Sequence, residues 1–376
     1  MKNNITILLF VLVSSICFAQ ELTQPPSGDN QRATVSQNIG MVTISIRYSS
    51  PDVHGPDGAD RTGHIWGELV HYGFIDQGFG QSKAAPWRAG ANENTTITFS
   101  HAVKIGGKNI MAGTYGVFLD VEREGSWSWI FSKNSTSWGS YFYDAKEDAL
   151  RVQTTAVEVP YTEWLTYGFD DRGPNAATAY LQWEKKRIPF KIEVPNINEL
   201  YVAEMRKELR SNPGFNYQNW TSAAQFCVQN KINLEEALIW AEVAVSTPYI
   251  GEENFNTLQT KSTVLDALGR GADAEAVMDK AIKHPSATMQ SIDQYGKTLL
   301  AAGKNEKALE VFKLNKQMHL KDMFTTNVGL ARGYTGVGNK KNAIKSWEIA
   351  IKNLPEDQKE NLKEYQAELN KLKGGV

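Results

Sequence analysis

The feature that most constrains this chain is a change in the spacing of its apolar residues near Pro195. Before that proline, short stretches alternate apolar and polar residues, as in residues 41–48 (MVTISIRY), which is the period of a half-buried β-strand. After it, apolar residues recur every three or four positions, as in an α-helix with one face on a core. The two periods predict two domains of different secondary structure, and a length of 376 residues suits two domains.

The region before Pro195 has the pattern of an antiparallel β-sandwich. Residues 20–195 hold seven of the ten tryptophans, and turn residues separate their apolar runs. Gly106 and Gly107 fall between two short apolar stretches and predict a hairpin turn. No long helical pattern interrupts the strands, which favours two packed sheets. The predicted strands are residues 41–48, 95–101, 114–121, 127–132, 150–159, 162–169, 177–183 and 188–194.

The region after Pro195, residues 196–376, contains an internal repeat. Leu299, Gly303, Ala308 and Phe312 recur 35 residues later as Tyr334, Gly338, Ala343 and Trp347. The order of glycine turn, alanine and aromatic residue resembles the tetratricopeptide repeat, which implies an α-solenoid of helix pairs. The register of the first two pairs stays open, because Ala237 and Ala276 are 39 residues apart. The predicted pairs are 217–229 with 233–246, 254–268 with 272–284, 288–302 with 305–318, and 324–337 with 340–353, followed by a capping helix at 357–372.

The longest apolar run lies at the start of the chain. Residues 5–16 (ITILLFVLVSSI) are fewer than the roughly 20 residues that a transmembrane helix needs. Small residues lead to Ala19, which indicates a secretory signal peptide at residues 1–19. Cys17 offers a lipoprotein alternative, which the bulky Ile16 before it disfavours. We expect an exported mature chain, in the periplasm or cell envelope, without a transmembrane segment.

The composition argues against several classes of protein. Forty Lys and Arg stand against 42 Asp and Glu, so no overall positive charge exists to attract nucleic acid. A complete GxGxxG, a phosphate-binding loop, a CxxC, an HExxH and a GxSxG are all missing, and we expect no cofactor. Cys227 is the one cysteine after the predicted leader, and its apolar helical surroundings predict a buried, inert thiol.

A series of motifs before Pro195 resembles the bacterial domain of unknown function 2911 family. The resemblance covers about residues 25–195 and implies a mostly β domain behind a signal peptide, with no established activity. His64 and His71 stand where the resemblance leads us to expect a basic residue and a proline, so it does not support a histidine-based site. The motifs are, in order, residues 48–51 (YSSP), 63–70 (GHIWGELV), 87–93 (WRAGANE), 112–118 (AGTYGVF) and 138–141 (WGSY).

Histidines and acidic residues between positions 52 and 71 leave a metal site open as an alternative. Imidazole and carboxylate groups suit zinc, and the acidic spacing of residues 52–60 suggests calcium. The segment lacks the closing glutamate of an EF-hand loop and is rich in turn residues, so we predict no metal.

The candidate recognition residues of the β-domain are concentrated in residues 87–93. Arginine offers a planar fork of donors and tryptophan a stacking face, which suits a polar ring or a peptide. The alternative is structural: Arg88 and Glu93 pair to tie the loop to the sandwich, and the aromatic residues fill its core. The candidates are Trp87, Arg88, Asn92, Glu93, Trp138 and Tyr141.

Three functions fit these features. The favoured one is a non-enzymatic interaction or scaffold protein that binds a protein or peptide partner through its helical repeats. Its groove is expected on the first helix of each pair, at polar positions such as Gln294, Asn327 and Arg332. A carbohydrate-binding module with a glycan ligand is the alternative, on the basis of an aromatic-rich sandwich and export. A hydrolase is the third, without a motif to support it.

Overall fold

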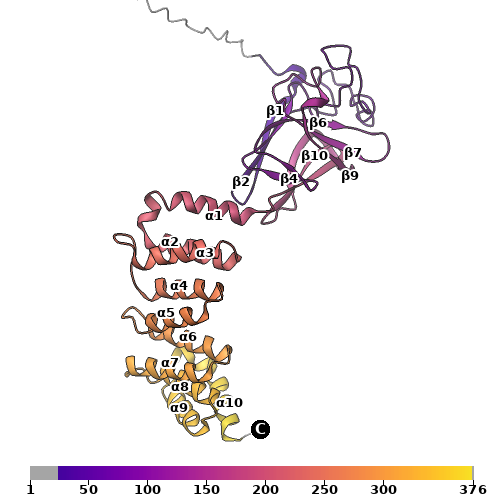
Figure 1. Cartoon of the computed structure of the whole chain (residues 1–376). Helices are drawn as coiled ribbons and strands as arrows, with labels where there is room; N and C mark the ends of the chain where they lie inside the picture. The colour runs from indigo at the N-terminus through magenta and orange to yellow at the C-terminus, as the bar shows by residue number, and fades with distance from the viewer. Residues whose placement is uncertain (1–23, 375–376) are drawn as a thin grey trace, which may run out of the picture. The chain divides into compact units, whose positions relative to one another are not determined.

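Figure 1 shows the computed structural model, in which residues 24–374 are described. The chain divides into two compact units between Ile197 and Asn198. The predicted signal peptide at residues 1–19, with Cys17, lies outside the described residues. Among the helices that are described, none is long and apolar enough to cross a bilayer.

The N-terminal unit consists of two antiparallel sheets. Its strands are β1 (Gln31–Ile39), β2 (Val42–Ser50), β3 (Thr95–Phe99), β4 (Val103–Ile105), β5 (Lys108–Ile110), β6 (Gly113–Asp120), β7 (Trp127–Ser132), β8 (Asp148–Thr154), β9 (Val157–Asp170) and β10 (Ala176–Glu193). The order in the larger sheet is β1-β2-β3-β6-β7-β8, and that in the smaller sheet is β5-β4-β10-β9. The prediction of an antiparallel β-sandwich is confirmed.

Local sequence explains most of these strands. In β2, Val42, Ile44 and Ile46 are buried while Thr43 and Arg47 are exposed, so the predicted alternation is the one observed. The β4–β5 hairpin turns at Gly106 and Gly107, whose φ angles are +55° and +77°, in the left-handed region that glycine adopts at low cost.

The predicted strands differ from the observed ones at three places. The predicted strand 150–159 covers parts of two strands, the end of β8 and the start of β9, because the chain leaves the larger sheet at residues 155–156. The patterns at 177–183 and 188–194 belong to one strand, β10, because pairing with β9 continues through register shifts around Glu184. Strand β1 was not predicted, since its sequence, QRATVSQNI, has few apolar residues. It pairs with β2 along its whole length, and this pairing stabilises it as an edge strand.

Aromatic contacts join the two sheets. The ring centroids of Trp129 on β7 and Phe190 on β10 are 5.0 Å apart, and those of Tyr48 on β2 and Tyr167 on β9 are 4.9 Å apart. Trp129 is completely buried, as expected for a tryptophan in the core of a sandwich.

The connection between β2 and β3, residues 51–94, has no regular strand or helix and carries most of the predicted site. It is anchored at several points by backbone pairs. Trp87 and Leu119 of β6 exchange two hydrogen bonds, of 3.1 and 2.8 Å. Because one end of this connection is fixed on β6, residues 87–93 have a defined position beside the sheet.

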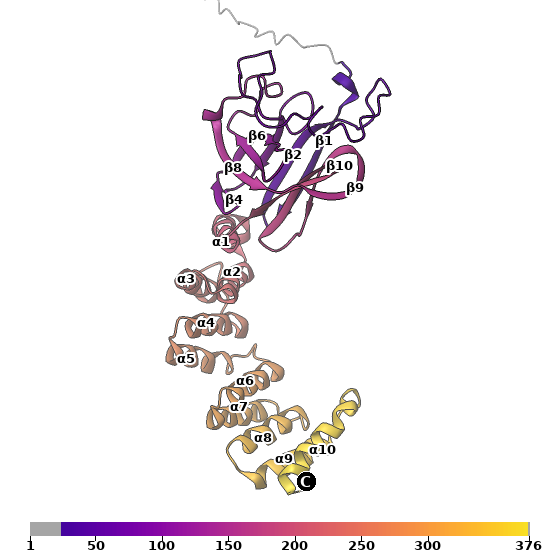
Figure 2. The same cartoon turned by 90° about the vertical axis from the view of Figure 1, so that its right-hand side faces the viewer.

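The C-terminal unit is helical. Helix α1 (Ile197–Glu208), which was not predicted, comes first and α10 (Leu362–Lys373) comes last. Between them stand α2 (Tyr217–Asn230) with α3 (Leu234–Ser246), α4 (Phe255–Ala267) with α5 (Gly271–Ala281), α6 (Met289–Ala301) with α7 (Asn305–Met318), and α8 (Thr325–Gly336) with α9 (Lys340–Lys352). Figure 2 shows these pairs stacked one after another, and the predicted solenoid is confirmed.

Glycines allow three of these helices to approach closely. A Cβ added at Gly296 on α6 or at Gly329 on α8 would lie 2.5 or 2.6 Å from the Phe312 ring of α7. The 35-residue pattern therefore places the aromatic ring of one pair against glycine backbone of that pair and the next. Cys227 is buried in the first pair, and burial raises the pKa of its thiol to about 11.

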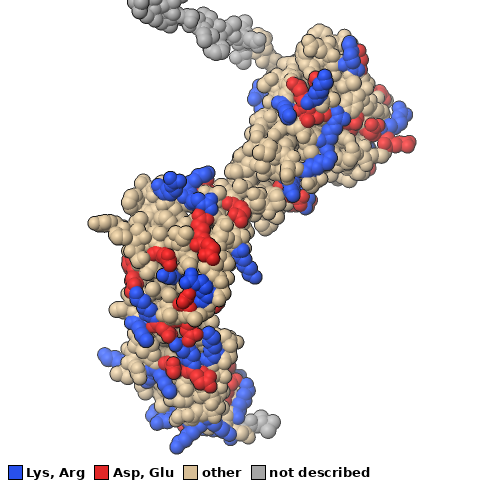
Figure 3. All heavy atoms as spheres, viewed as in Figure 1, with Lys and Arg blue, Asp and Glu red and all other residues tan. Residues whose placement is uncertain are grey.

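Ion pairs connect successive helix pairs on the surface. Lys304 and Lys307 of the third pair reach Glu275 and Asp279 on α5, at 3.1 and 2.7 Å. On the face drawn in Figure 3, basic and acidic side chains alternate along the helical unit. Exposed pairs of this kind contribute little stability each, so the register of the stack depends mainly on the packed interior.

Candidate functional site

The loop at residues 87–93 has a strained backbone that buried hydroxyls hold in place. Ala89 and Asn92 have φ angles of +49° and +57°, which are unfavourable for residues with a Cβ. The Ala89 carbonyl accepts hydrogen bonds from Thr95 Oγ1, at 3.0 Å, and from the Tyr167 hydroxyl, at 2.8 Å. Such strain persists where the surroundings over-determine the conformation, and it is frequent in binding sites.

One side of this loop borders a cavity of about 290 Å³, which we call the tryptophan hollow. Its walls come from the 51–94 connection, from β10 and from the segment before β1. The lining residues are Asn30, Pro51, Arg61, Leu69, Val70, His71, Gln77, Trp87, Arg88, Gly90, Ala91, Asn92 and Trp183. Three predicted site residues, Trp87, Arg88 and Asn92, are therefore brought together.

Packed indole rings form the apolar wall of the tryptophan hollow. Trp87 and Trp183 are stacked, with ring centroids 6.2 Å apart and 16° between planes, and Trp66 meets Trp87 edge to face at 5.8 Å. Trp87 is only 7% exposed. Its ring is part of a rigid wall and does not offer the open stacking platform that a glycan-binding tryptophan needs.

Arg88 is positioned by contacts on several sides. Its Nη1 donates to the Asn92 carbonyl at 3.0 Å, and its guanidinium lies 5.2 Å from the centre of the Tyr141 ring. A Cβ added at Gly139 would lie 2.6 Å from Arg88 Cζ, so glycine gives the arginine its space. Arg88, Asn92 and Tyr141 thus form one group.

His71 and Gln77 line the hollow, and each has one buried acceptor atom that lacks a donor within residues 24–374. The His71 Nδ1 lies 3.0 Å from the Gly73 carbonyl, which can only accept, so Nδ1 carries the proton. Burial lowers the pKa of His71, with Arg88 adding to the effect, and leaves Nε2 of the neutral ring an acceptor. The Gln77 amide donates to Ser140 Oγ at 3.2 Å, and its Oε1 has no partner.

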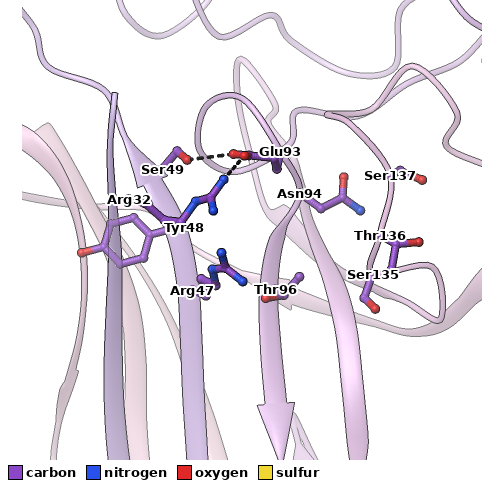
Figure 4. A pocket seen from close by; sticks show the side chains of 10 residues that line it. All are labelled: Arg32, Arg47, Tyr48, Ser49, Glu93, Asn94, Thr96, Ser135, Thr136 and Ser137. Carbon is purple, nitrogen blue, oxygen red and sulfur yellow. Dashed lines mark hydrogen bonds and ion pairs between the residues drawn. The ribbon is translucent and has the colours of Figure 1, made fainter. Parts of the chain in front are cut away.

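Glu93 lies on the other side of the loop, in a second hollow of about 170 Å³ (Figure 4). Its carboxylate accepts from Arg32 of β1 and from Ser49 Oγ. The expected pair between Arg88 and Glu93 is therefore wrong, because the chain turns between them and β1 supplies the nearer arginine. Trp138 is 49% exposed and joins neither group.

The histidines at 54 and 64 are engaged by carboxylates. His54 Nδ1 lies 3.0 Å from Glu163 Oε2, and His64 Nδ1 lies 2.8 Å from Glu68 Oε1. In the part of the chain that the structure describes, no three His, Cys, Asp or Glu side chains are arranged to hold a metal ion.

The helical unit has its own groove, of about 410 Å³, between α4, α5 and α6. Gln294 of α6 lines it together with Gln259 and Thr263 of α4 and Thr298 of α6. Gln259 and Gln294 are 35 residues apart, as are Thr263 and Thr298. The 35-residue period of the sequence could therefore have predicted Gln259 and Thr263 as groove residues.

The other two predicted groove positions lie elsewhere. Asn327 is only 4% exposed, and its amide donates to the carbonyl of Met323, which lies just before α8. The expectation that it faces a groove is wrong, because α8 turns this position inward. Arg332 is half-buried and does not line the groove of α4 to α6.

A protein-family model matches most of the β-unit. Residues 30–192 match the family described as "Protein of unknown function (DUF2911)". The resemblance drawn from the ordered motifs is confirmed, and both hollows belong to this DUF2911 region. No curated protein matches the chain.

The helical unit is similar to solved tetratricopeptide repeat proteins. A tetratricopeptide repeat protein from Parabacteroides merdae ATCC 43184 is 20% identical over 47% of this chain and 66% of that chain, with a TM-score of 0.33. MamA from Desulfovibrio magneticus RS-1 is 19% identical over 42% and 93%, with a TM-score of 0.28. YrrB, described as a tetratricopeptide repeat protein with an unusual peptide-binding site, is 20% identical over 43% and 80%, with a TM-score of 0.30.

Proposed function

We propose that this chain is an exported, non-enzymatic interaction protein of the bacterial cell envelope. In this proposal the helical unit binds an extended segment of a partner protein in the groove between α4 and α6. The support comes from one observation: the same two polar residue types recur at equivalent positions of successive first helices and line one groove.

The chemistry of that lining suits a peptide backbone. The Gln259 and Gln294 side-chain amides make no hydrogen bond within residues 24–374, and each offers donors and an acceptor. A peptide in extended form presents N–H and C=O groups at regular intervals. Two amides from consecutive repeats can therefore bond the backbone at two places, while Met278 and Leu299 supply apolar contact.

Selection from a random peptide library, followed by fluorescence polarisation on the full chain, tests the groove. We expect enriched peptides whose affinity falls by about tenfold or more in the double variant Gln259→Ala, Gln294→Ala, because two polar partners are lost. The matched control is Gln317→Ala with Gln366→Ala, two exposed glutamines outside the groove. Failure to enrich any peptide, or equal affinity of both double variants, contradicts the proposal.

Export rests on the sequence of the leader and has a separate test. We expect mass spectrometry of the protein from its native host to find a chain that begins at Gln20, because signal peptidase cleaves after a small residue such as Ala19. A lipid-modified Cys17 or a retained Met1 would exclude this processing.

A further inference from the structure

We propose that the second hollow of the β-unit, which lies around Arg47, binds a sulfate monoester group that a larger molecule carries. This site is independent of the proposed peptide groove, since every residue that lines it belongs to the DUF2911 region. The ligand class follows from the place of Arg47 on the sheet, the unused donors beside it, and the charge and size of the hollow.

The floor of this hollow is a row of residues on the outer face of the larger sheet. Arg47 of β2 pairs with Thr96 of β3, and Thr96 pairs with Gly116 of β6, so the three stand side by side across the strands. Ile46 and Ile97, which precede and follow them in the chain, are buried on the inner face. Because successive side chains of a strand point to opposite faces, Arg47 and Thr96 point outward.

Residues 134–137 form a wall above that floor. A Cβ added at Gly116 would clash with the Asn134 carbonyl oxygen, so glycine is what lets this segment lie against β6. The backbone N–H of Asn94 donates to the Ser137 carbonyl at 3.2 Å and holds the other end of the segment. The wall is therefore fixed beside the floor by contacts at both of its ends.

Donors that the protein itself does not use face one another across this hollow. Figure 4 shows the Arg47 guanidinium beside Thr96, with Ser135 and Thr136 opposite them. Arg47 is exposed and makes no ion pair or hydrogen bond within residues 24–374. The hydroxyls of Thr96, Ser135 and Thr136 also have no partner in that range. A sulfate ester has three terminal oxygens that only accept, so it can bond with the guanidinium and the hydroxyls together.

The charge of the lining selects a group with a single negative charge. Arg32 and Glu93 pair with each other, which leaves the charge of Arg47 unbalanced. A sulfate monoester carries one negative charge and balances it. A phosphate monoester carries about 1.5 to 2 negative charges at neutral pH, and the excess meets the Glu93 carboxylate in the same lining. A carboxylate has the right charge but one oxygen fewer, so a hydroxyl of the hollow stays unbonded.

The size and polarity of the hollow limit what enters it to one polar group. Its volume of about 170 Å³ is below the range of roughly 300–1,000 Å³ that is usual for whole small-molecule ligands. Tyr48 belongs to the lining, but its ring packs toward the other sheet, with its centroid 4.9 Å from that of Tyr167. The lining therefore suits the sulfate of a sulfated polysaccharide, whose sugar rings stay outside, better than it suits an apolar side chain.

NMR titration of the isotope-labelled full chain with methyl sulfate, at neutral pH and low salt, tests the proposal. We expect saturable shifts in the signals of residues 134–137, and methyl phosphate and acetate should bind at least about tenfold more weakly. Dextran sulfate should shift the same signals, because Arg47 is open to solvent. No shift with methyl sulfate overturns the site. Equal or tighter binding of methyl phosphate or acetate overturns the ligand class, and no shift with dextran sulfate overturns the larger carrier.

A variant of Arg47 ties binding to the hollow. Arg47→Gln keeps most of the length of the side chain but removes its charge and its fork of donors, so we expect the affinity for methyl sulfate to fall by about tenfold or more. Arg172→Gln is the matched control, since Arg172 is also exposed and lies outside the hollow. Unchanged affinity in Arg47→Gln, or an equal loss in Arg172→Gln, contradicts the proposal.

Thr96→Val gives a second test that leaves every charge in place and decides the matter if Arg47→Gln does not fold. Valine has the shape of threonine and suits a strand, so only the hydroxyl is lost, and we expect the affinity to fall by roughly threefold to tenfold. Thr98→Val is the matched control, because Thr98 is exposed on the same strand but does not line the hollow. Unchanged affinity in Thr96→Val, or an equal loss in Thr98→Val, would show that this floor does not hold the ligand.

Discussion

At the scale of single residues, Glu163 organises the start of the long β2–β3 connection. It accepts hydrogen bonds from the backbone N–H of Val53 and His54, at 3.1 and 2.8 Å, and contacts the His54 ring and the Tyr161 hydroxyl. Partial burial opposes its ionisation, but the hydrogen bonds from Tyr161 and His54 outweigh it and lower the pKa of Glu163 to about 2. The same contact with Glu163 raises the pKa of His54.

These shifts predict how stability depends on pH. The raised pKa of His54 means that its contribution is complete below 6.5 and is lost as pH rises through the folded value. The lowered pKa of Glu163 means that its contribution is complete above 4.5 and is lost as pH falls toward about 2. Both contributions are complete between pH 4.5 and pH 6.5, so we expect the ion pair to stabilise the protein most in that range. Urea unfolding at a series of pH values measures this.

Glu163→Gln separates the ion pair from the rest of the protein. We expect it to return the pKa of His54 toward 6.5 and to lower stability, because the neutral amide loses the charge that attracts His54. Histidine NMR titration measures the shift, and His64, whose pKa is raised by Glu68, is the internal reference. An unchanged His54 titration in this variant would show that Glu163 does not cause the shift.

At the scale of elements, the three-helix contact around Phe312 determines the spacing of the third and fourth helix pairs. Gly296 of α6, with Gly329 and Gly333 of α8, leaves room for the ring. A larger residue at any of them requires the ring to move or the helices to separate. Because Phe312 is 1% exposed, the ring has little free space to move into.

Gly296→Ala tests this contact. Alanine favours a helix over glycine by up to about 1 kcal/mol, whereas overpacking a filled core costs about 1–3 kcal/mol. We expect a net loss of stability of about 1–2 kcal/mol in chemical denaturation. Gly271→Ala on α5 is the control: an added Cβ there meets nothing within 4 Å, so stability should hold or rise. A stabilised Gly296→Ala would show that the ring adapts without cost.

At the scale of the whole molecule, the chain has two units with separate interiors. Aromatic residues between two sheets form one interior, and the helical unit buries its own clusters, such as that of Cys227, Trp240 and Val264. Each unit is of a size that folds alone in other proteins.

Separate expression tests the independence of the units. We expect residues 20–195 to give a β-type circular dichroism spectrum and residues 199–376 a helical one, each with a cooperative thermal transition. The full chain serves as the reference, and the sum of the two fragment spectra should reproduce its spectrum. If neither fragment unfolds cooperatively while the full chain does, the two units depend on each other for folding.

Much of the architecture could be predicted from sequence because hydrophobic spacing is local. The alternation in β2 and the 35-residue recurrence of Ala308 as Ala343 each specify which face of an element is buried. The same rule failed for β1, a polar edge strand that forms only because β2 lies beside it. It also missed the continuity of β10, where pairing with β9 overrides a charged run.

Which residues line the hollows and the groove depended on the tertiary structure. From the sequence alone, residues 87–93 could be named as candidates for recognition, the change from strands to helices could be located near Pro195, and Gln294 could be assigned to a first helix. Only the folded chain paired Glu93 with Arg32, turned Asn327 inward and brought His71 and Gln77 beside Arg88. The spacing of apolar residues in the sequence indicates which residues of one strand or helix are buried and which are exposed. Contacts between residues far apart depend on how loops cross the sheets, and that follows from packing the whole unit.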